Sequence, residues 1–407
     1  MKFELTNEQR PYFGLEPVKP EWDRVILKGD TYREESILYF EGDYIKRYII
    51  STEFQYKESQ YNELTRSRNI LLPVTAKGKE KKLTASVLES RQPTGLYCVV
   101  DSAGRILIGN FNTQTSFYDS SWEQPVSRHQ IPIKNQVEIF IDTTPEGYLA
   151  AINGFKKGKR KNAKFKPGDF FAFKINREEY GFGRILLNID ELKKKNIITK
   201  NHGLSLIMTK PVLVKIYTYI SKVKDIEIEK LKDVSALPSD YMMDNAFFYG
   251  EYEVIGHKQL ESEDFDFPIS YGRHIDFSKH CAFFQWGLIH CELSTSTFNK
   301  YFVADNPLVP VDSQSRKTTN PYGYYSIGFR PKYSGADIKE AIANNGKFDF
   351  EACQLFGSIF DLRNPGNKEI RKEIMTMFGL DPAKSYNENC KLTNTMLLPE
   401  LITVISK

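Results

Sequence analysis

The clearest alternation of apolar and polar positions lies between residues 164 and 187, in the stretch KFKPGDFFAFKINREEYGFGRILL. Phe171, Phe173 and Ile175 fall on one side of an extended strand, and Phe170 and Ala172 fall on the other. Polar residues at 176–179 interrupt this strand before a second one begins at Tyr180. The pattern predicts a β-hairpin with aromatic side chains on both faces. Such a hairpin is marginal alone in water, so we expect it to pair with further strands.

Shorter apolar runs before this hairpin also predict strands, at residues 22–28, 37–40, 45–53, 69–74, 97–100 and 105–111. Tight turns are expected at residues 41–43 and 101–104, which contain Gly42 and Gly104. One short helix is predicted at 7–13. Another is predicted to begin at Pro145 with Thr144 as its cap. The first 160 residues therefore predict a strand-rich domain with a few short helices.

Beyond the hairpin, apolar runs predict strands at residues 204–208, 212–220, 247–255 and 283–293. Residues 305–335 are rich in Pro, Gly, Ser and Asn and predict a loop. Helical periodicity returns where Ile370, Ile374 and Phe378 share one face before Gly379. We expect a second β-rich domain at 161–300, with a loop-rich and helical extension at 301–407. The predicted fold class is α+β.

The chain contains two segments that are rich in basic residues. Seven cations precede Asp169 without an intervening acid: Lys156, Lys157, Lys159, Arg160, Lys161, Lys164 and Lys166. We interpret this run as an exposed linker, which places the domain boundary near residue 160; the alternative is an arm that binds phosphate or nucleic acid. A smaller cluster of lysines surrounds Gly78 and is interpreted as a solvated turn: Lys77, Lys79, Lys81 and Lys82.

Composition narrows the classes of protein that fit. A length of 407 residues predicts two or three domains, and a net charge of +4 argues against a dedicated nucleic-acid binder. The five cysteines form no C-x-x-C pair, which indicates reduced thiols and a cytoplasmic protein. The first residues contain no apolar signal region, and no apolar run approaches 18 residues. We therefore expect no membrane association, and the sequence does not indicate an oligomeric state.

Two blocks of sequence resemble one known family. The first is the order basic–Pro–Gly–Asp–Phe-Phe-Ala-Phe followed by Tyr-Gly-Phe-Gly-Arg-Ile-Leu, and the second is residues 266–272 followed by 284–287. Together they resemble the bacterial immunity protein 26 family, over roughly residues 164 to 300. The resemblance implies an immunity protein that binds and neutralises a cognate polymorphic toxin, without catalysis and without a cofactor.

Candidate partner-binding residues lie in and between these blocks. Four carboxylates occur within six residues at 261–266, with no cation among them, and an exposed turn of this kind would carry a local negative field. Large aromatic and arginine side chains often dominate interface energetics. The candidates are Glu261, Glu263, Asp264, Asp266, Tyr271, Trp286, Tyr180 and Arg184. For each aromatic ring the alternative is a place in the core.

A cluster of potential metal ligands supports a rival hypothesis. It contains His274, Asp276, His280, Cys281, His290 and Cys291, which include ligand types that suit zinc. The alternative function is therefore a metal-assisted, phosphoesterase-like hydrolase that uses His274, Asp276 and His280. No phosphate-binding loop, dinucleotide fingerprint or nucleophile elbow supports an enzyme.

Overall fold

The computed structural model describes residues 3–75, 77–123, 130–207, 209–274, 279, 281–294, 333–350 and 361–406. The chain divides into two compact units. Unit 1 comprises residues 1–163 together with 174–179 and 248–252, and unit 2 comprises 164–173, 180–247 and 253–407. Both contain antiparallel sheets, and unit 2 ends in helices, so the predicted α+β class is confirmed.

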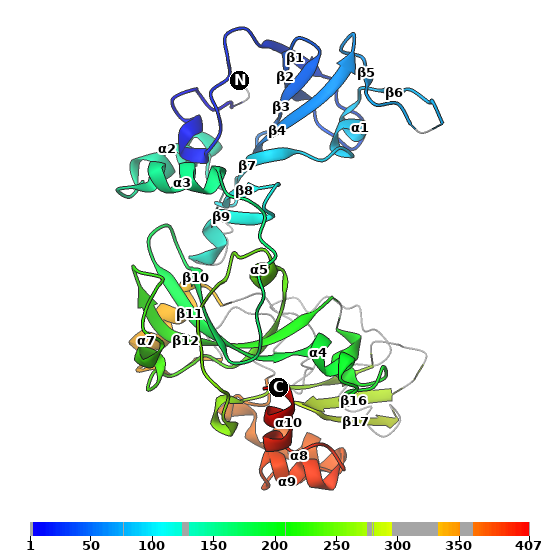
Figure 1. The fold of residues 1–407 in the computed structure, drawn as a ribbon, viewed down its shortest axis with the longest axis vertical. Coiled ribbons are helices and arrows are strands. Elements are labelled where there is room, and N and C mark those ends of the chain that lie inside the picture. Colours follow the sequence, from blue (N-terminus) through cyan, green and yellow to red (C-terminus); the bar gives the residue numbers. More distant parts are fainter. Residues whose placement is uncertain are drawn as a thin grey trace. The chain divides into compact units, whose positions relative to one another are not determined.

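Unit 1 is built on an antiparallel sheet with the path β1-β2-β3-β4-β7-β8-β9 (Figure 1). These strands are β1 (Asp23–Leu27), β2 (Ser36–Glu41), β3 (Tyr44–Ser51), β4 (Gln55–Arg66), β7 (Thr94–Asp101), β8 (Ile106–Asn110) and β9 (Thr115–Asp119). Two short strands, β5 (Ile70–Leu71) and β6 (Lys81–Lys82), continue from the end of β4. The predicted turns at Gly42 and Gly104 are confirmed, and both glycines have positive φ angles of 60° and 93°.

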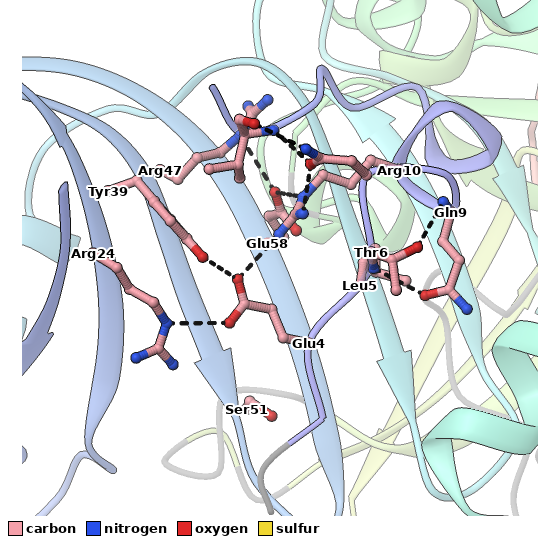
Figure 2. Close-up of polar contacts among 12 residues, drawn as sticks. Glu4, Leu5, Thr6, Gln9, Arg10, Arg24, Tyr39, Arg47, Ser51 and Glu58 are labelled. Atoms are coloured by element: carbon pink, nitrogen blue, oxygen red, sulfur yellow. Dashed lines mark hydrogen bonds and ion pairs between the residues drawn. The ribbon is translucent and has the colours of Figure 1, made fainter. Parts of the chain in front are cut away.

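The long strand β4 was not predicted because it buries charge. Arg10 Nε donates to Glu58 Oε1 at 3.1 Å, and Arg47 Nε lies 3.3 Å from the same oxygen (Figure 2). The Tyr56 hydroxyl donates to the second Glu58 oxygen. Glu58 is fully buried on β4. This ionic network therefore fastens the N-terminal segment, through Arg10, onto the middle of the sheet.

A second acidic residue extends the same network toward solvent. Glu4 accepts hydrogen bonds from the Tyr39 hydroxyl at 2.5 Å, from Arg10 at 3.2 Å and from Arg24 at 3.4 Å (Figure 2). Burial, together with the hydrogen bond to Glu4, raises the pKa of Tyr39 to about 12. Tyr39 therefore stays protonated and remains a donor to Glu4.

Helices cover both apolar clusters of the unit 1 sheet. The helices α2 (Ile133–Asp142) and α3 (Tyr148–Lys156) pack through Val137, Phe140 and Ile152 onto a cluster that contains Cys98 and Ile108. The short helix α1 (Ala85–Glu89) packs through Leu88 onto a cluster that contains Phe40, Ile45 and Tyr61. Each helix thus buries the apolar stripe that its sequence provides.

Two expectations about helix starts need correction. The helix predicted from Pro145 begins at Tyr148, because Gly147 has a left-handed φ of 77° that a helical residue does not adopt. Thr144 instead donates its hydroxyl to Phe140 O at 3.0 Å and closes α2. The helix predicted at 7–13 is a single 3-10 turn, η1 (Arg10–Phe13), which ends at Gly14.

Unit 2 contains two antiparallel sheets. The larger has the order β13-β12-β11-β10-β14, and its β10–β11 hairpin confirms the prediction from residues 164–187. Its strands are β10 (Asp169–Lys174), β11 (Tyr180–Asn188), β12 (Pro211–Ser221), β13 (Asp240–Met243) and β14 (Glu253–His257). The smaller sheet contains β15 (Ile269–Arg273), β16 (Cys281–Trp286) and β17 (Ile289–Ser294). Phe170 and Phe171 are both buried, so both faces of β10 are covered.

Three predicted strands of unit 2 were wrong in part. Residues 283–293 form the hairpin β16–β17, which turns at Gly287 with a φ of 56°. Residues 247–255 contain the end of helix α5 (Asn245–Phe248) before β14 begins. The segment predicted as a strand at 204–208 lies largely in the 3-10 helix η3 (Gly203–Leu206), and Met208 lies outside the described residues.

Helices at the C-terminal end complete the core of unit 2 (Figure 1). The described helices of this unit are α4 (Ile189–Lys194), α7 (Gly335–Ala343), α8 (Lys368–Met377), α9 (Tyr386–Leu392) and α10 (Leu398–Ile405), besides α5. Ile374, Cys390 and Leu401 from α8, α9 and α10 join Tyr271 and Phe284 of the smaller sheet in one cluster. Most of the loop predicted at 305–335 lies outside the described residues.

Candidate functional site

One face of the larger unit 2 sheet carries a buried cation that organises the acidic segment. Arg184 lies on β11 and is only 4% exposed. Its guanidinium group stacks over the Phe170 ring of β10 at 4.7 Å. The surrounding cluster contains Phe170, Phe182, Tyr217 and Leu231. A guanidinium in such apolar surroundings requires anionic or carbonyl partners.

The acidic segment supplies those partners. Arg184 Nη1 donates to Asp264 Oδ1 at 2.7 Å, while Nη2 donates to Lys258 O at 2.7 Å and to Gln259 O at 2.9 Å. The three acceptors lie on the chain before and within the 3-10 helix η5 (Ser262–Asp264). Arg184 thereby holds the segment at two main-chain positions and one carboxylate.

A second cation reaches the same carboxylate from the neighbouring strand. Lys215 on β12 places Nζ 2.7 Å from Asp264 Oδ1, and Asp264 Oδ2 accepts a hydrogen bond from Glu261 N at 2.9 Å. Burial alone would raise the pKa of Asp264. Its hydrogen bonds to Lys215 and Glu261 and the charges of Lys215 and Arg184 outweigh that effect, so the pKa is lowered. Asp264 is therefore ionised and fixed.

The four predicted carboxylates have two different environments. Asp264 is bound by two cations, and Asp266 accepts from Ser239 N at 3.0 Å and lies 3.2 Å from Arg363 Nη1. Glu261 and Glu263 are exposed, and neither side chain forms an ion pair with another described residue. We call residues 261–266 the anchored turn. Asp266 is also exposed, but its carboxylate is paired with Arg363. The anchored turn therefore presents the carboxylates of Glu261 and Glu263, which form no ion pair with described residues, on a backbone held by Asp264 and Asp266.

The remaining predicted residues lie elsewhere. Tyr271 of β15 has no exposed surface, and burial raises its pKa well above the ordinary value. Trp286 of β16 is 9% exposed and meets the Tyr386 ring edge to face at 5.1 Å. Tyr180, at the start of β11, is half-buried. The structure therefore brings Arg184 to the anchored turn, and it places Tyr271 and Trp286 in the separate core that the C-terminal helices complete.

Sequence reasoning missed Lys215 and Arg363. A signal for Lys215 was present, because it is the lone charge within the apolar run 211–217 of β12. A cation inside a buried strand indicates a buried anion nearby. No such signal marked Arg363, because it follows a segment without a clear pattern of apolar and polar positions. It reaches Asp266 and also pairs with Asp361 at 2.7 Å.

The predicted metal cluster is only partly described. His274 Nε2 lies 3.3 Å from Lys279 Nζ, and His290 Nε2 lies 3.3 Å from Glu292 Oε1. Burial lowers the pKa of His290. Asp276 and His280 lie outside the described residues. Among the residues that the structure describes, no three His, Cys, Asp or Glu side chains are placed to hold a metal ion.

Comparison with known families singles out one segment. Residues 166–281 match the family described as Immunity protein 26. The matched segment contains β10 to β15, Arg184, Lys215 and the whole anchored turn. No curated protein and no solved structure matches the chain. Within the described part of the chain, no helix combines the length and the apolar composition that crossing a membrane requires.

Proposed function

We propose that this protein is an immunity protein that binds and neutralises a cognate bacterial toxin, without chemistry of its own. The match of residues 166–281 to the Immunity protein 26 family is the observation that carries this proposal. The name of that family concerns immunity, and immunity proteins of toxin systems act by binding. A bound immunity protein covers the toxin's active site or a surface that the toxin needs.

The anchored turn is our candidate for the part that meets the toxin. Arg184 and Lys215 fix its backbone through Asp264, so binding requires little further ordering of the turn. Glu261 and Glu263 remain exposed on it. Two carboxylates on a pre-ordered turn would attract a cationic surface of the toxin and increase the rate of association. Tyr180, which is half-buried on the same strand as Arg184, remains a further candidate contact.

Binding kinetics with the toxin encoded by the neighbouring gene test the proposal. The double variant Glu261→Lys with Glu263→Lys reverses two exposed charges that form no ion pair with described residues. It also removes the cap that the Glu261 side chain provides for η5, while the contacts of Asp264 with Arg184 and Lys215 remain. We expect association to slow by about 10-fold or more at low salt, and the difference to shrink as salt rises, because the Debye length is about 8 Å at physiological ionic strength. Dissociation should change little.

A matched control is available within unit 2. Glu227 and Glu229 are also exposed and have the same spacing in sequence as Glu261 and Glu263. The variant Glu227→Lys with Glu229→Lys changes the net charge equally, so association should remain close to that of the unaltered protein. Equal slowing by both variants would mean that only net charge matters. Absence of binding to any neighbouring gene product would refute the immunity proposal itself.

A further inference from the structure

The last residue of the anchored turn is held by an arginine that lies outside the family segment. Arg363 Nη1 donates to Asp266 O at 2.8 Å and lies 3.2 Å from Asp266 Oδ2. The same nitrogen donates to Ser239 O at 3.0 Å. Ser239 is fully buried, and its hydroxyl donates to Asp266 O at 3.1 Å. Asp266 is therefore fixed through its main chain as well as its side chain.

Arg363 is itself held by a buried carboxylate. Its Nη2 donates to Asp361 Oδ2 at 2.7 Å, and its Nε lies 3.1 Å from both Asp361 carboxylate oxygens. The Asp361 side chain is only 2% exposed. A planar guanidinium fork can bind several acceptors in a fixed geometry. Arg363 thus joins the C-terminal extension to the anchored turn.

One aromatic residue lies between the two fixed carboxylates of the turn. Phe265 follows Asp264 and precedes Asp266, and both of these aspartates are bound by cations. The Phe265 N–H donates to Ser262 O at 3.3 Å. Its ring packs against that of Phe267, with centroids 5.2 Å apart, and the residue remains partly exposed. The backbone of Phe265 is therefore ordered before a partner binds.

A partly exposed ring on an ordered backbone is suited to bind an apolar patch of another protein. Such binding costs little conformational entropy, and aromatic rings are frequent among the residues that dominate interface energetics. Glu261 and Glu263 are exposed on the same turn. Protein interfaces usually combine an apolar centre with a polar rim. The complementary surface of the partner is therefore an apolar patch bordered by basic residues.

We propose that Phe265 is the apolar anchor of toxin recognition and that Arg363 is the positioning residue that keeps this ring in place. The inference rests on the function proposed above, because the partner is the toxin. The exposed glutamates steer the encounter, whereas the ring holds the complex once it has formed. The C-terminal extension thereby takes part in recognition, although the matched residues 166–281 do not include it.

Binding kinetics of the full chain with the toxin encoded by the neighbouring gene test the anchor. Phe265→Ala should dissociate about 30-fold faster, while its association rate changes by less than about 2-fold. Phe265→Leu keeps an apolar side chain and should dissociate no more than about 5-fold faster. The control Phe54→Ala removes a phenylalanine of unit 1 that is 53% exposed. It should dissociate as the unaltered protein does.

The variant Arg363→Lys tests the positioning role. Lysine keeps a positive charge for Asp361 but lacks the planar fork that reaches Asp266 as well. The loss of hydrogen bonds should speed dissociation by about 5-fold. If Arg363 acts through Phe265, Arg363→Lys should add less than about 2-fold in a protein that already carries Phe265→Ala. A separate structural role would instead multiply the two effects.

The outcomes separate this inference from the immunity proposal. If the unaltered protein binds the toxin and Phe265→Ala dissociates no faster, the anchor is overturned while the immunity proposal stands. Multiplied effects of the two substitutions overturn the positioning role. If no neighbouring gene product binds, the immunity proposal fails and this inference fails with it.

Near-ultraviolet circular dichroism checks that each variant is folded. Should Phe265→Ala not fold, hydrogen exchange of the unaltered protein decides the question. Bound toxin should slow the exchange of the amides at 261–266. Unchanged exchange there, in a complex that does form, would overturn the anchor.

Discussion

Arg184 and Asp264 are 80 residues apart in the sequence, yet their side chains meet at 2.7 Å beneath the anchored turn. The arginine is almost completely buried, and the carboxylate lies between it and Lys215. Removing one member of a buried ion pair leaves an uncompensated charge. This pair therefore connects the stability of unit 2 with the position of the two exposed glutamates.

Replacing Arg184 tests that connection. Arg184→Met keeps the apolar stem over Phe170 but removes the hydrogen bonds to Asp264, Lys258 and Gln259. We expect the free energy of unfolding to fall by about 3 kcal/mol, measured by urea denaturation. Glu263→Gln, on the same turn but exposed, should change it by less than about 0.5 kcal/mol. Equal stability of the two variants would show that Arg184 does not hold the turn.

The lowered pKa of Asp264 predicts a specific dependence of stability on pH. An unfolded Asp has a pKa of about 3.9, and the folded value is lower, so the ionised group stabilises the fold above about pH 4. This contribution is lost as pH falls through the folded pKa. Urea denaturation of the unaltered protein and Asp264→Asn between pH 2 and 6 should show a difference in stability that narrows toward low pH. A difference that stays constant would contradict the prediction.

Glu58 should be essential for the stability of unit 1. In Glu58→Gln, Arg10 and Arg47 lose their shared carboxylate while both stay buried. We expect a loss of about 3 kcal/mol in thermal or urea unfolding. Glu138→Gln is a suitable comparison, because Glu138 forms only an exposed pair with Lys134 and should change stability by about 0.5 kcal/mol or less. A neutral effect of Glu58→Gln would mean that the network does not stabilise the sheet.

The C-terminal helices should stabilise the unit that contains the family segment. Leu401 of α10 is fully buried in the same cluster as Tyr271, whereas Leu392 of α9 is 51% exposed. Leu401→Ala should lower the free energy of unfolding by about 2–5 kcal/mol. Leu392→Ala should cost less than about 1 kcal/mol. If Leu401→Ala lowers the free energy of unfolding no more than Leu392→Ala does, α10 does not stabilise this core.

Limited trypsin digestion tests the predicted boundary near residue 160. Residues 157–166 have no regular secondary structure and are mostly exposed, so the first cuts should fall between Lys156 and Lys164 and leave two resistant fragments. A protease specific for acidic residues should leave the run intact, because it contains no acid. Uniform degradation by trypsin would contradict the boundary.

Much of the sheet structure followed from the sequence because aromatic and β-branched residues alternate there. The β10–β11 hairpin and the strand β12 are examples. The strand β4 was not predicted because Glu58 occupies a buried position where an apolar residue is expected. Its burial is possible because Arg10 and Arg47, which are distant in the sequence, pair with it. The turn between β16 and β17 was not predicted, because Leu288 beside Gly287 makes the apolar run resemble one continuous strand.

The acidic residues of the candidate site could be predicted from the sequence, but the role of each one could not. The sequence showed four carboxylates at 261–266. Which of them are anchored depends on Arg184, Lys215 and Arg363, which tertiary folding brings to them. Likewise, Tyr271 and Trp286 looked suitable as anchors for a partner, and only the C-terminal helices show that these rings lie within a core.

The family match stops at Cys281, which is the first residue of β16. β15 pairs with β16, and the cluster around them continues to Ile405. The segment that matches the family is thus shorter than the segment that forms the core of unit 2. A gene rearrangement that moved only residues 166–281 into another protein would carry Ile269 and Tyr271 without the strands and helices that cover them. Successful transfer of residues 166–281 to another protein would therefore require transfer of the C-terminal helices α8, α9 and α10 as well.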